Sequence, residues 1–392
     1  MIKVADRLNN VEEYYFSKKL DEIRVLRSQG RDVLNLGIGS PDLPPDEGVV
    51  QELVESASKI EHHAYQPYRS TPELRESMSR FYYETFSIKL DPQHEILPLL
   101  GSKEGVMYVS LAFLNPGDTV LVPNPGYPAY SSIAKLLGTN VETYGLTEEN
   151  NWYPDFEDLE SRDLEKVKLM WVNYPHMPTG APATDELFHD LVAFAKRNEI
   201  LLVNDNPYSQ ILNDQPVSIL KFDPDLSHVI ELNSLSKSFN MAGWRVGMVL
   251  GHKNYMDAVL QAKSNVDSGM FLPIQHAAAK ALELKREWHD ERNEIYETRR
   301  IKARRILESI GCKIGSNQVG MFIWAKVPDE IMNIHYLIDD LLHNALVFIT
   351  PGEIFGSNGS RYLRISLCAV EELYDKALER IEIWQQEKLQ LA

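Results

Sequence analysis

Cysteine is scarce in this chain, because only Cys312 and Cys368 occur among its 392 residues. Two cysteines are too few for a disulfide framework, and these two do not form a metal-spaced pair. The sequence also lacks an apolar run long enough to span a membrane, and its first residues contain no apolar signal region. These absences lead us to expect a cytoplasmic protein that neither enters a membrane nor holds a metal ion.

Positive charge is also in short supply. The chain has 40 Lys and Arg residues against 57 Asp and Glu residues, which gives a formal net charge of −17. Surfaces that bind nucleic acid or anionic membranes need clustered basic residues, so we expect neither partner. Hydrophobic residues make up 44% and charged residues 25%, which is ordinary for a globular protein. A chain of this length can bury a large core and is expected to form more than one domain.

Strands and helices alternate in the middle of the chain. Near-continuous apolar runs, typical of buried parallel strands, occupy residues 119–122, 168–173, 200–204 and 229–232. The pattern predicts an α/β domain with a mostly parallel sheet. Ligands of such sheets bind beyond the carboxyl ends of the strands. Polar residues gather at those ends, in segments 124–127, 173–180, 205–208 and 234–237.

The remaining segments predict a smaller second domain. We expect a long helical region over about 276–310, and then strands and helices near 321–325, 331–343, 361–366 and 370–386. At the N-terminus, Phe16, Leu20 and Ile23 have the spacing of an amphipathic helix that must dock on another element. The predicted organisation is an N-terminal segment (1–45) that joins the small domain, a large domain (46–285) and a small C-terminal domain (286–392).

A lysine follows the last of the buried strands. Lys237 is expected to be poorly solvated there, which lowers the pKa of its amine and makes the amine a nucleophile. Ser234, Ser236 and Arg245 lie nearby in sequence and provide two hydroxyls and a guanidinium, which suit a phosphate dianion. An amine beside a phosphate site suggests pyridoxal phosphate. A single Ser-x-Ser-Lys motif is more often an ordinary solvated loop, so this interpretation needs support from other segments.

Other strand ends provide that support. Gly101 and Ser102 open a helix whose N-terminus can attract an anion. Asp205 follows a buried strand, where a carboxylate could pair with a pyridinium nitrogen. Tyr208 could place its hydroxyl on a phenolic oxygen, and the ring of Tyr127 could lie against a planar cofactor. Each residue alone is more often a turn, cap or packing residue, but their joint occurrence at successive strand ends is much less expected by chance.

Taken together, these residues resemble the class I/II aminotransferases, fold-type I enzymes that use pyridoxal phosphate, from the 36–42 loop to residues 364–366. The resemblance implies a seven-stranded, mostly parallel large-domain sheet flanked by helices, with a smaller α+β C-terminal domain. It implies that Lys237 is the Schiff-base lysine and proton carrier, with Asp205 and Tyr208 as the pyridine and phenolic-oxygen partners and Tyr127 stacked on the ring. The implied phosphate contacts are Ser102, Lys103, Ser234, Ser236 and Arg245.

The resemblance also implies an obligate homodimer with shared active sites, in which Tyr65 reaches the phosphate of the neighbouring subunit. Gly39 and Arg364 match the groups that hold the substrate α-carboxylate, and Asn173 is expected among the substrate contacts. The implied substrates are an amino acid and a 2-oxo acid. Segments 37–42, 263–269 and 351–356 look similar to the LL-diaminopimelate aminotransferase-like branch.

The sequence departs from the family pattern at Met177. The family usually has an asparagine there that donates to the phenolic oxygen of the cofactor, whereas a thioether has no donor. Ser70 also replaces a common glycine, which we expect to be a minor backbone matter. Because the same scaffold hosts other carbon-bond chemistry, a β-lyase is the alternative enzyme. A ligand-sensing regulator is the non-enzyme alternative, but it would need a DNA-binding module that this acidic chain does not offer.

Overall fold

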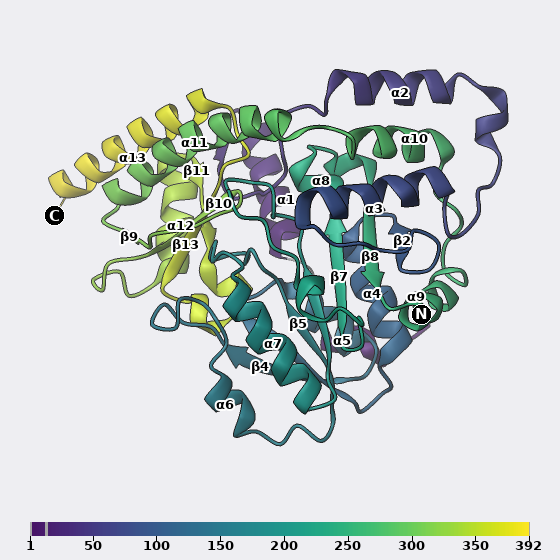
Figure 1. Cartoon of the computed structure of the whole chain (residues 1–392). Coiled ribbons are helices and arrows are strands. Elements are labelled where there is room, and N and C mark those ends of the chain that lie inside the picture. The colour runs from purple at the N-terminus through teal and green to yellow at the C-terminus, as the bar shows by residue number, and fades with distance from the viewer. Residues whose placement is uncertain (1, 12–14, 392) are drawn as a thin grey trace.

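Seven strands form the larger sheet, in the order β2-β8-β7-β6-β5-β3-β4 (Figure 1). The computed structural model describes residues 2–11 and 15–391. Within this sheet β8 pairs antiparallel with β2 and β7, and the other pairs are parallel. The strands are β2 (Ile96–Leu99), β3 (Thr119–Asn124), β4 (Asn140–Gly145), β5 (Val167–Val172), β6 (Leu201–Asp205), β7 (Val229–Ser234) and β8 (Gly247–Gly251). The predicted α/β fold with a mostly parallel seven-stranded sheet is confirmed.

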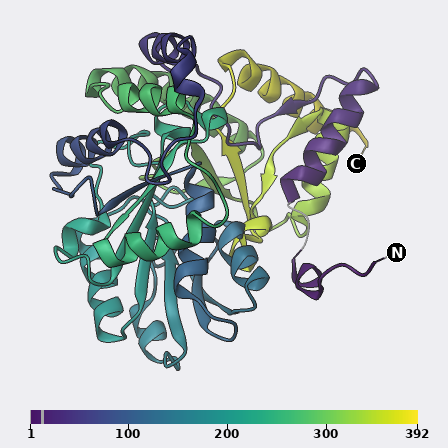
Figure 2. The ribbon, with the colours of Figure 1, turned by 90° about the vertical axis from the view of Figure 1, so that its right-hand side faces the viewer.

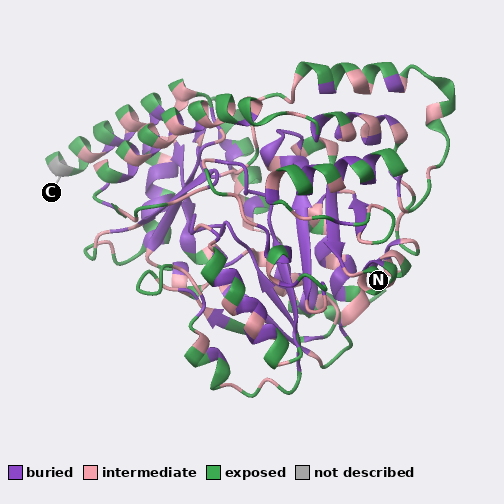
Figure 3. Ribbon diagram, in the orientation of Figure 1, coloured by how far each residue is buried: buried purple, intermediate pink, exposed green. Residues whose placement is uncertain are grey.

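Helices cover both faces of this sheet, which explains why its strands are apolar without alternation. Met170 and Leu202 belong to one hydrophobic cluster, whereas their neighbours Leu169 and Val203 belong to another on the opposite face. Figure 3 shows the strands buried between helices whose outer surfaces are exposed. One face packs against α3 (Pro72–Phe86), α7 (Asp185–Arg197) and α10 (Leu272–Ala281), and the other against α4 (Ser102–Phe113), α5 (Pro128–Leu136) and α9 (Lys253–Lys263).

A smaller antiparallel sheet follows, in the order β12-β13-β10-β9. Its strands are β9 (Lys313–Ile314), β10 (Phe322–Lys326), β12 (Thr350–Pro351) and β13 (Tyr362–Ser366). The helices around it are α11 (Arg286–Ser309), α12 (Ile334–Asp340) and α13 (Glu371–Leu391), and α11 and α13 run side by side in Figure 1. The predicted smaller α+β C-terminal part is therefore present.

The N-terminal segment joins this smaller part, as expected from its sequence. Helix α1 (Tyr15–Ser28) buries Phe16, Ile23 and Leu26 in the hydrophobic cluster of the small sheet. Strand β1 (Leu34–Asn35) pairs in parallel with β11 (Val347–Phe348). Residues 2–10 are all exposed; their N-terminal end extends outward in Figure 2, whereas the short helix η1 (Asp6–Asn10) lies beside α5. The domain boundaries at 45/46 and 285/286 stay a prediction.

Two details differ from the sequence expectation. The helical region near 276–310 is divided into α10 and α11, with a turn at 282–285 that contains neither glycine nor proline to announce it. Strands β4 and β8, which extend the sheet beyond the predicted parallel core, were not anticipated. The remaining helices are α2 (Glu47–Ala57), α6 (Phe156–Glu160) and α8 (Leu235–Ser238). Within the described ranges, no helix is long and apolar enough to cross a bilayer.

Candidate active site

The carboxyl ends of β5, β6 and β7 meet at a small cavity of about 140 Å³. This cavity, here called the strand-end cavity, collects most of the side chains that the sequence singled out from separate segments. They are Ser102, Lys103, Tyr127, Asn173, Asp205, Tyr208, Ser234, Ser236, Lys237 and Arg245, and Met177 lies with them. Parallel strands end at the same edge of a sheet, which is why residues more than 130 positions apart come together here.

Lys237 stands in the short helix α8, which begins immediately after β7. Its Nζ donates a hydrogen bond of 2.6 Å to the carbonyl oxygen of Gly39. Burial lowers the pKa of Lys237 below its ordinary value, and the positive charges of Arg364 and Arg245 act in the same direction. A lowered pKa increases the fraction of neutral amine, which is the nucleophilic form.

Asp205 ends strand β6 and is only 6% exposed. Its Oδ2 accepts a hydrogen bond of 2.9 Å from the Tyr130 hydroxyl, whereas its Oδ1 is buried without a hydrogen-bond partner. Burial raises the pKa of Asp205 to about 6. A buried carboxylate oxygen without a partner is costly, so this position suits a ligand that brings a positively charged N–H group.

Another group of residues in the strand-end cavity suits an anion. Gly101 precedes α4 and has no side chain to cap it, so the amide groups of the first helical turn are directed toward the end where Ser102 lines the cavity. Gly101 has a φ of +88°, and a Cβ there would lie 2.2 Å from Arg245 Nη2, so a larger residue would displace the guanidinium. Arg245 Nη1 donates to Ser236 Oγ at 3.4 Å. Hydroxyls, a guanidinium and a helix N-terminus together form a phosphate-binding arrangement.

A second cavity of about 530 Å³ opens from the first and is here called the arginine cavity. Tyr127, Met177, Tyr208 and Lys237 line both. Its distinguishing residue is Arg364 on β13, which is 3% exposed and donates from Nη2 to the Gly37 carbonyl oxygen at 2.8 Å. The Arg364 Cζ lies 4.0 Å from the ring centre of Phe322 and 4.6 Å from that of Phe355. These rings fix the plane of the guanidinium, which can then bind a carboxylate in a bidentate manner.

Met177 lies where the two cavities join. Its Sδ is 3.3 Å from Arg364 Nη1, and its backbone N–H donates to Asn173 Oδ1 at 2.9 Å. Asn173 Nδ2 in turn donates to the backbone carbonyl of Asp205. Asn173 therefore uses its amide to hold the loop together, while the Met177 thioether occupies the position beside the arginine.

Buried hydroxyls complete the junction. Tyr208 packs edge-on against Phe322 at 5.9 Å between ring centres, and burial raises the pKa of its hydroxyl, which keeps its proton at neutral pH. Tyr130 was not anticipated from the sequence. Its ring stacks on Trp171 at 4.9 Å, and its hydroxyl holds Asp205. Tyr130 follows Tyr127 by three residues at the start of α5, and this helical spacing could have predicted that the two side chains lie on the same side.

Among the predicted site residues, only Tyr65 lines neither cavity within the described chain. Gly39 and Arg364 line the arginine cavity. The Tyr65 side chain is 91% exposed. Gly39 and Arg364 lie together as expected, and a Cβ at Gly39 would meet the Phe322 ring at 2.3 Å. The close approach of that ring explains why residue 39 has no side chain.

The loop that carries Gly39 is held by an ion pair whose arginine is buried. Arg299 on α11 donates to both carboxylate oxygens of Asp42, at 2.7 and 2.9 Å, and also to the Leu367 carbonyl oxygen at 3.0 Å. The Arg299 side chain is 3% exposed. This bidentate contact gives the Gly37–Asp42 loop a defined position relative to the small sheet.

Comparison with known proteins identifies the family. The sequence profile of "Aminotransferase class I and II" matches residues 31–381. The chain belongs to this family. LL-diaminopimelate aminotransferase of Dehalococcoides mccartyi strain BAV1 is 37% identical over 97% of this chain and 98% of that protein. The enzyme of the same name from Aquifex aeolicus is also 37% identical, over 97% and 99% of the two chains.

Solved structures of the family have the same fold as this aminotransferase. Substrate-bound BacF from Bacillus subtilis aligns with a TM-score of 0.92 at 34% identity, over 97% of each chain. A Thermus thermophilus aspartate aminotransferase variant aligns with a TM-score of 0.90 at 25% identity, over 98% of this chain and all of that one. The prediction of a pyridoxal-phosphate-dependent aminotransferase of fold type I is confirmed, which sets the β-lyase and regulator alternatives aside.

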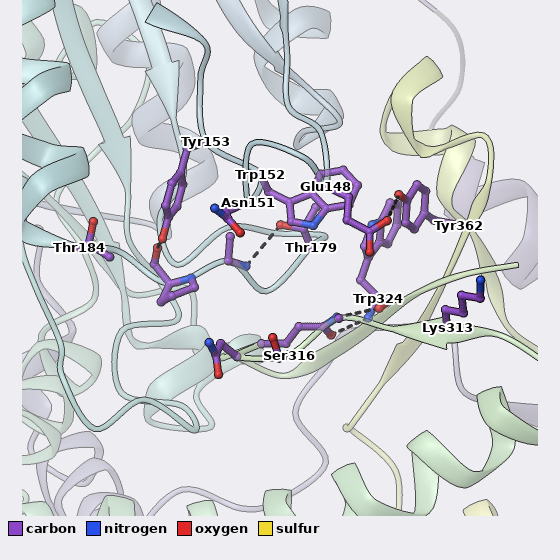
Figure 4. A pocket seen from close by; sticks show the side chains of 15 residues that line it. Glu148, Asn151, Trp152, Tyr153, Thr179, Thr184, Lys313, Ser316, Trp324 and Tyr362 are labelled. Atoms are coloured by element: carbon purple, nitrogen blue, oxygen red, sulfur yellow. Dashed lines mark hydrogen bonds between the residues drawn. The ribbon is translucent and has the colours of Figure 1, made fainter.

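The aminotransferase also has a cavity of about 540 Å³ that contains none of the predicted site residues (Figure 4). Trp152, Trp324 and Tyr362 line one end, and the Tyr362 hydroxyl donates to Glu148 at 3.1 Å. Gln318 Nε2 donates to the Trp324 carbonyl oxygen at 2.7 Å, and Gln318 Oε1 accepts from the Trp324 backbone N–H at 2.9 Å. Because this cavity lacks both Lys237 and Arg364, we do not assign the reaction to it.

Proposed function

We propose that this aminotransferase holds pyridoxal phosphate in the strand-end cavity and binds its amino-acid and 2-oxo-acid substrates in the arginine cavity. In this assignment Ser102, Lys103, Ser234, Ser236 and Arg245 hold the phosphate. Tyr127 packs on the cofactor ring, and Tyr208 donates to its phenolic oxygen. Lys237 stands at the junction, where the two cavities share a boundary.

One observation carries the proposal: Asp205 has a buried oxygen without a partner in the same cavity as the buried amine of Lys237. The pyridinium N–H of the cofactor would supply the missing donor, because a protonated ring nitrogen favours the ionised carboxylate. The phosphate-binding arrangement in the same cavity fits the phosphate group of that molecule. The donor set thus matches both ends of pyridoxal phosphate.

The residues of the chain then divide the reaction among them. When bound, pyridoxal phosphate supplies an electron-withdrawing ring that stabilises negative charge at the substrate Cα. Arg364 holds the substrate carboxylate and so orients the Cα–H bond. Lys237, as a neutral amine, removes the proton from the substrate Cα. It then delivers that proton to the cofactor carbon that is bonded to the same nitrogen. Asp205 stays ionised against the ring nitrogen, and Tyr208 keeps its hydroxyl proton as a donor.

A covalent trapping experiment tests the assignment. The purified protein is expected to be yellow, and borohydride should fix the cofactor irreversibly to one lysine. Peptide mass mapping should locate the label on Lys237. Lys103 lines the same cavity and is the matched alternative. A label on Lys103, or no label, would contradict the assignment.

We also propose a homodimer in which Tyr65 reaches the phosphate site of the partner subunit. Tyr65 is 91% exposed, and the apolar side chain of Ile60, five residues earlier in the chain, is 89% exposed. Large apolar side chains exposed this close together are typical of a surface that another protein covers. Mixing inactive Lys237→Ala subunits with weakened Tyr65→Phe subunits should produce hybrid sites with more activity than either parent. An active species that sediments as a monomer would contradict the dimer.

The names of the curated relatives make LL-diaminopimelate a candidate substrate, since two of them are 37% identical over nearly their whole length. In this assignment, substrate choice is set by the walls of the arginine cavity beyond Arg364.

A further inference from the structure

The walls of the arginine cavity are mostly apolar. Phe16 and Leu20 come from α1, Ile38 from the loop after β1, and Phe355 from η6 (Gly352–Phe355). Phe16 and Phe355 lie 6.4 Å apart between ring centres, and both flank the guanidinium of Arg364. A cavity of about 530 Å³ with such walls can enclose a large apolar side chain.

The charges of this cavity have one sign. Among the described residues that line it, the only charged side chains belong to Lys237 and Arg364, and none is an aspartate or glutamate. Both side chains already have tasks in the proposed function, on which this inference rests: Lys237 acts as a neutral amine, and Arg364 holds the α-carboxylate. A substrate whose side chain ends in an ammonium group would meet apolar walls and the positive charge of Arg364, and the described lining residues offer it no carboxylate.

We propose that the enzyme acts on amino acids with large apolar side chains, aromatic ones included, in preference to LL-diaminopimelate. The α-carboxylate binds Arg364, and the side chain packs among Phe16, Leu20, Ile38 and Phe355. The distal end of LL-diaminopimelate carries an ammonium and a carboxylate, and both groups would lose their hydration in this cavity. The described residues that line the cavity include no carboxylate to pair with the ammonium. The preference thus follows from desolvation as well as from shape.

A half-reaction test uses the full-length, cofactor-loaded protein. L-Phenylalanine, L-leucine, L-lysine and LL-diaminopimelate are added separately, and the loss of the yellow absorbance is followed by stopped flow. We expect the rate constant per molar substrate to be about 100-fold higher for phenylalanine or leucine than for the two amines. Faster reaction with LL-diaminopimelate would overturn the preference while leaving the aminotransferase assignment intact. If no amino acid changes the spectrum and no 2-oxo acid is formed, both the preference and the aminotransferase assignment are overturned.

A pair of variants on α1 links the preference to the cavity wall. Leu20 and Val25 are both exposed apolar residues of this helix, at 43% and 50%, but only Leu20 lines the cavity. Leu20→Asp places a carboxylate in the wall and should lower the phenylalanine rate while raising the lysine rate, which shifts their ratio by about tenfold. Val25→Asp adds the same charge to the same helix outside the cavity and should leave the ratio unchanged. Equal shifts in both variants would overturn the assignment.

A binding measurement gives a second readout that does not depend on turnover. 3-Phenylpropanoate and 6-aminohexanoate share a carboxylate, but one ends in a ring and the other in an ammonium group. Calorimetric titration of the wild-type protein should give a dissociation constant about tenfold lower for the phenyl acid. Leu20→Asp should narrow that difference and Val25→Asp should keep it. Tighter binding of 6-aminohexanoate to the wild type would contradict the proposal.

Discussion

The two cavities that meet at Lys237 differ in how the chain builds them. The strand-end cavity takes most of its residues from positions immediately after β5, β6 and β7, so one topological rule brings them together. The arginine cavity combines α1, the loop after β1, β10, η6 and β13, which follow no shared rule. The first is polar and fits a constant cofactor. The second is apolar around a single arginine, and its walls can vary without changing the reaction.

This difference predicts that the shared residue is needed by both cavities. Lys237→Ala should reduce transamination by about 10⁴-fold or more, because it removes both the nucleophile and the proton carrier. Lys103→Ala, which changes another lysine of the strand-end cavity, should cost less than about 100-fold. Steady-state rates at saturating substrate make the comparison. Equal losses would show that Lys237 has no special place at the junction.

The arginine cavity should be separable from cofactor binding. Arg364→Lys keeps the positive charge but loses the planar pair of donors, so kcat/KM should fall by about 10- to 150-fold, the value of one hydrogen bond to a charged group. Cofactor retention through dialysis should not change, because Arg364 does not line the strand-end cavity. Loss of the yellow colour in this variant would mean that the two cavities are not functionally distinct.

Without the cofactor, the strand-end cavity should lower the free energy of unfolding of the protein. Burial raises the pKa of Asp205 to about 6 from 3.8, so the folded state holds this proton more tightly than the unfolded state does. Its contribution to stability is therefore present below pH 4 and is lost as the pH rises through 6. Cofactor-free Asp205→Asn should be more stable than wild type by about 2–3 kcal/mol at pH 8, with the difference vanishing near pH 4.

Urea unfolding of the two cofactor-free proteins at both pH values measures this difference. Asp42→Asn is a useful control, since Asp42 is paired with Arg299 and its loss should destabilise the protein at pH 8. A destabilised Asp205→Asn protein at pH 8 would mean that Asp205 is already satisfied without a ligand.

The smallest effect is expected at the boundary between the cavities. Met177→Asn introduces a donor that would compete for the phenolic oxygen of the cofactor, which Met177 cannot do. The yellow protonated form should then be lost at a pH about one unit lower than in the wild type. The new amide can instead turn to Arg364, since the Met177 Sδ is 3.3 Å from Arg364 Nη1. An unchanged or higher spectral midpoint would contradict donation to the cofactor.

The same contrast explains what the sequence could predict. Asp205, Ser234 and Lys237 follow buried strands that are visible as apolar runs, so their convergence could be inferred from the parallel sheet. Tyr130 could have been found by helical spacing from Tyr127. The sequence could not predict the roles of Phe16, Phe322 and Phe355, because an aromatic residue in a strand or helix is ordinarily part of the core. Only the tertiary fold places these three rings around one guanidinium.

The fold shows the same division. The parallel core of the large sheet was predicted from its apolar strands, whereas β4 is largely exposed and lacks an apolar run. β8 is a short buried run, and its antiparallel direction cannot be read from its residues. The break between α10 and α11 was missed because residues 282–285 contain no glycine or proline. Tertiary packing, rather than local preference, ends α10 there.

The loop from Gly37 to Asp42 constrains the order in which the protein can fold during its synthesis. Its contacts reach far along the chain: Gly39 to Lys237, Asp42 to Arg299, and Gly37 to Arg364, the last pair 327 residues apart. At 5–20 residues per second, a ribosome needs roughly 15–65 s to make Arg364 after Gly37 has been added. During that time the large sheet can assemble, but the carboxylate-binding corner cannot. This loop is therefore synthesised before the whole large sheet but reaches its final place after it, and the enzyme gains its substrate site only when β13 has been made.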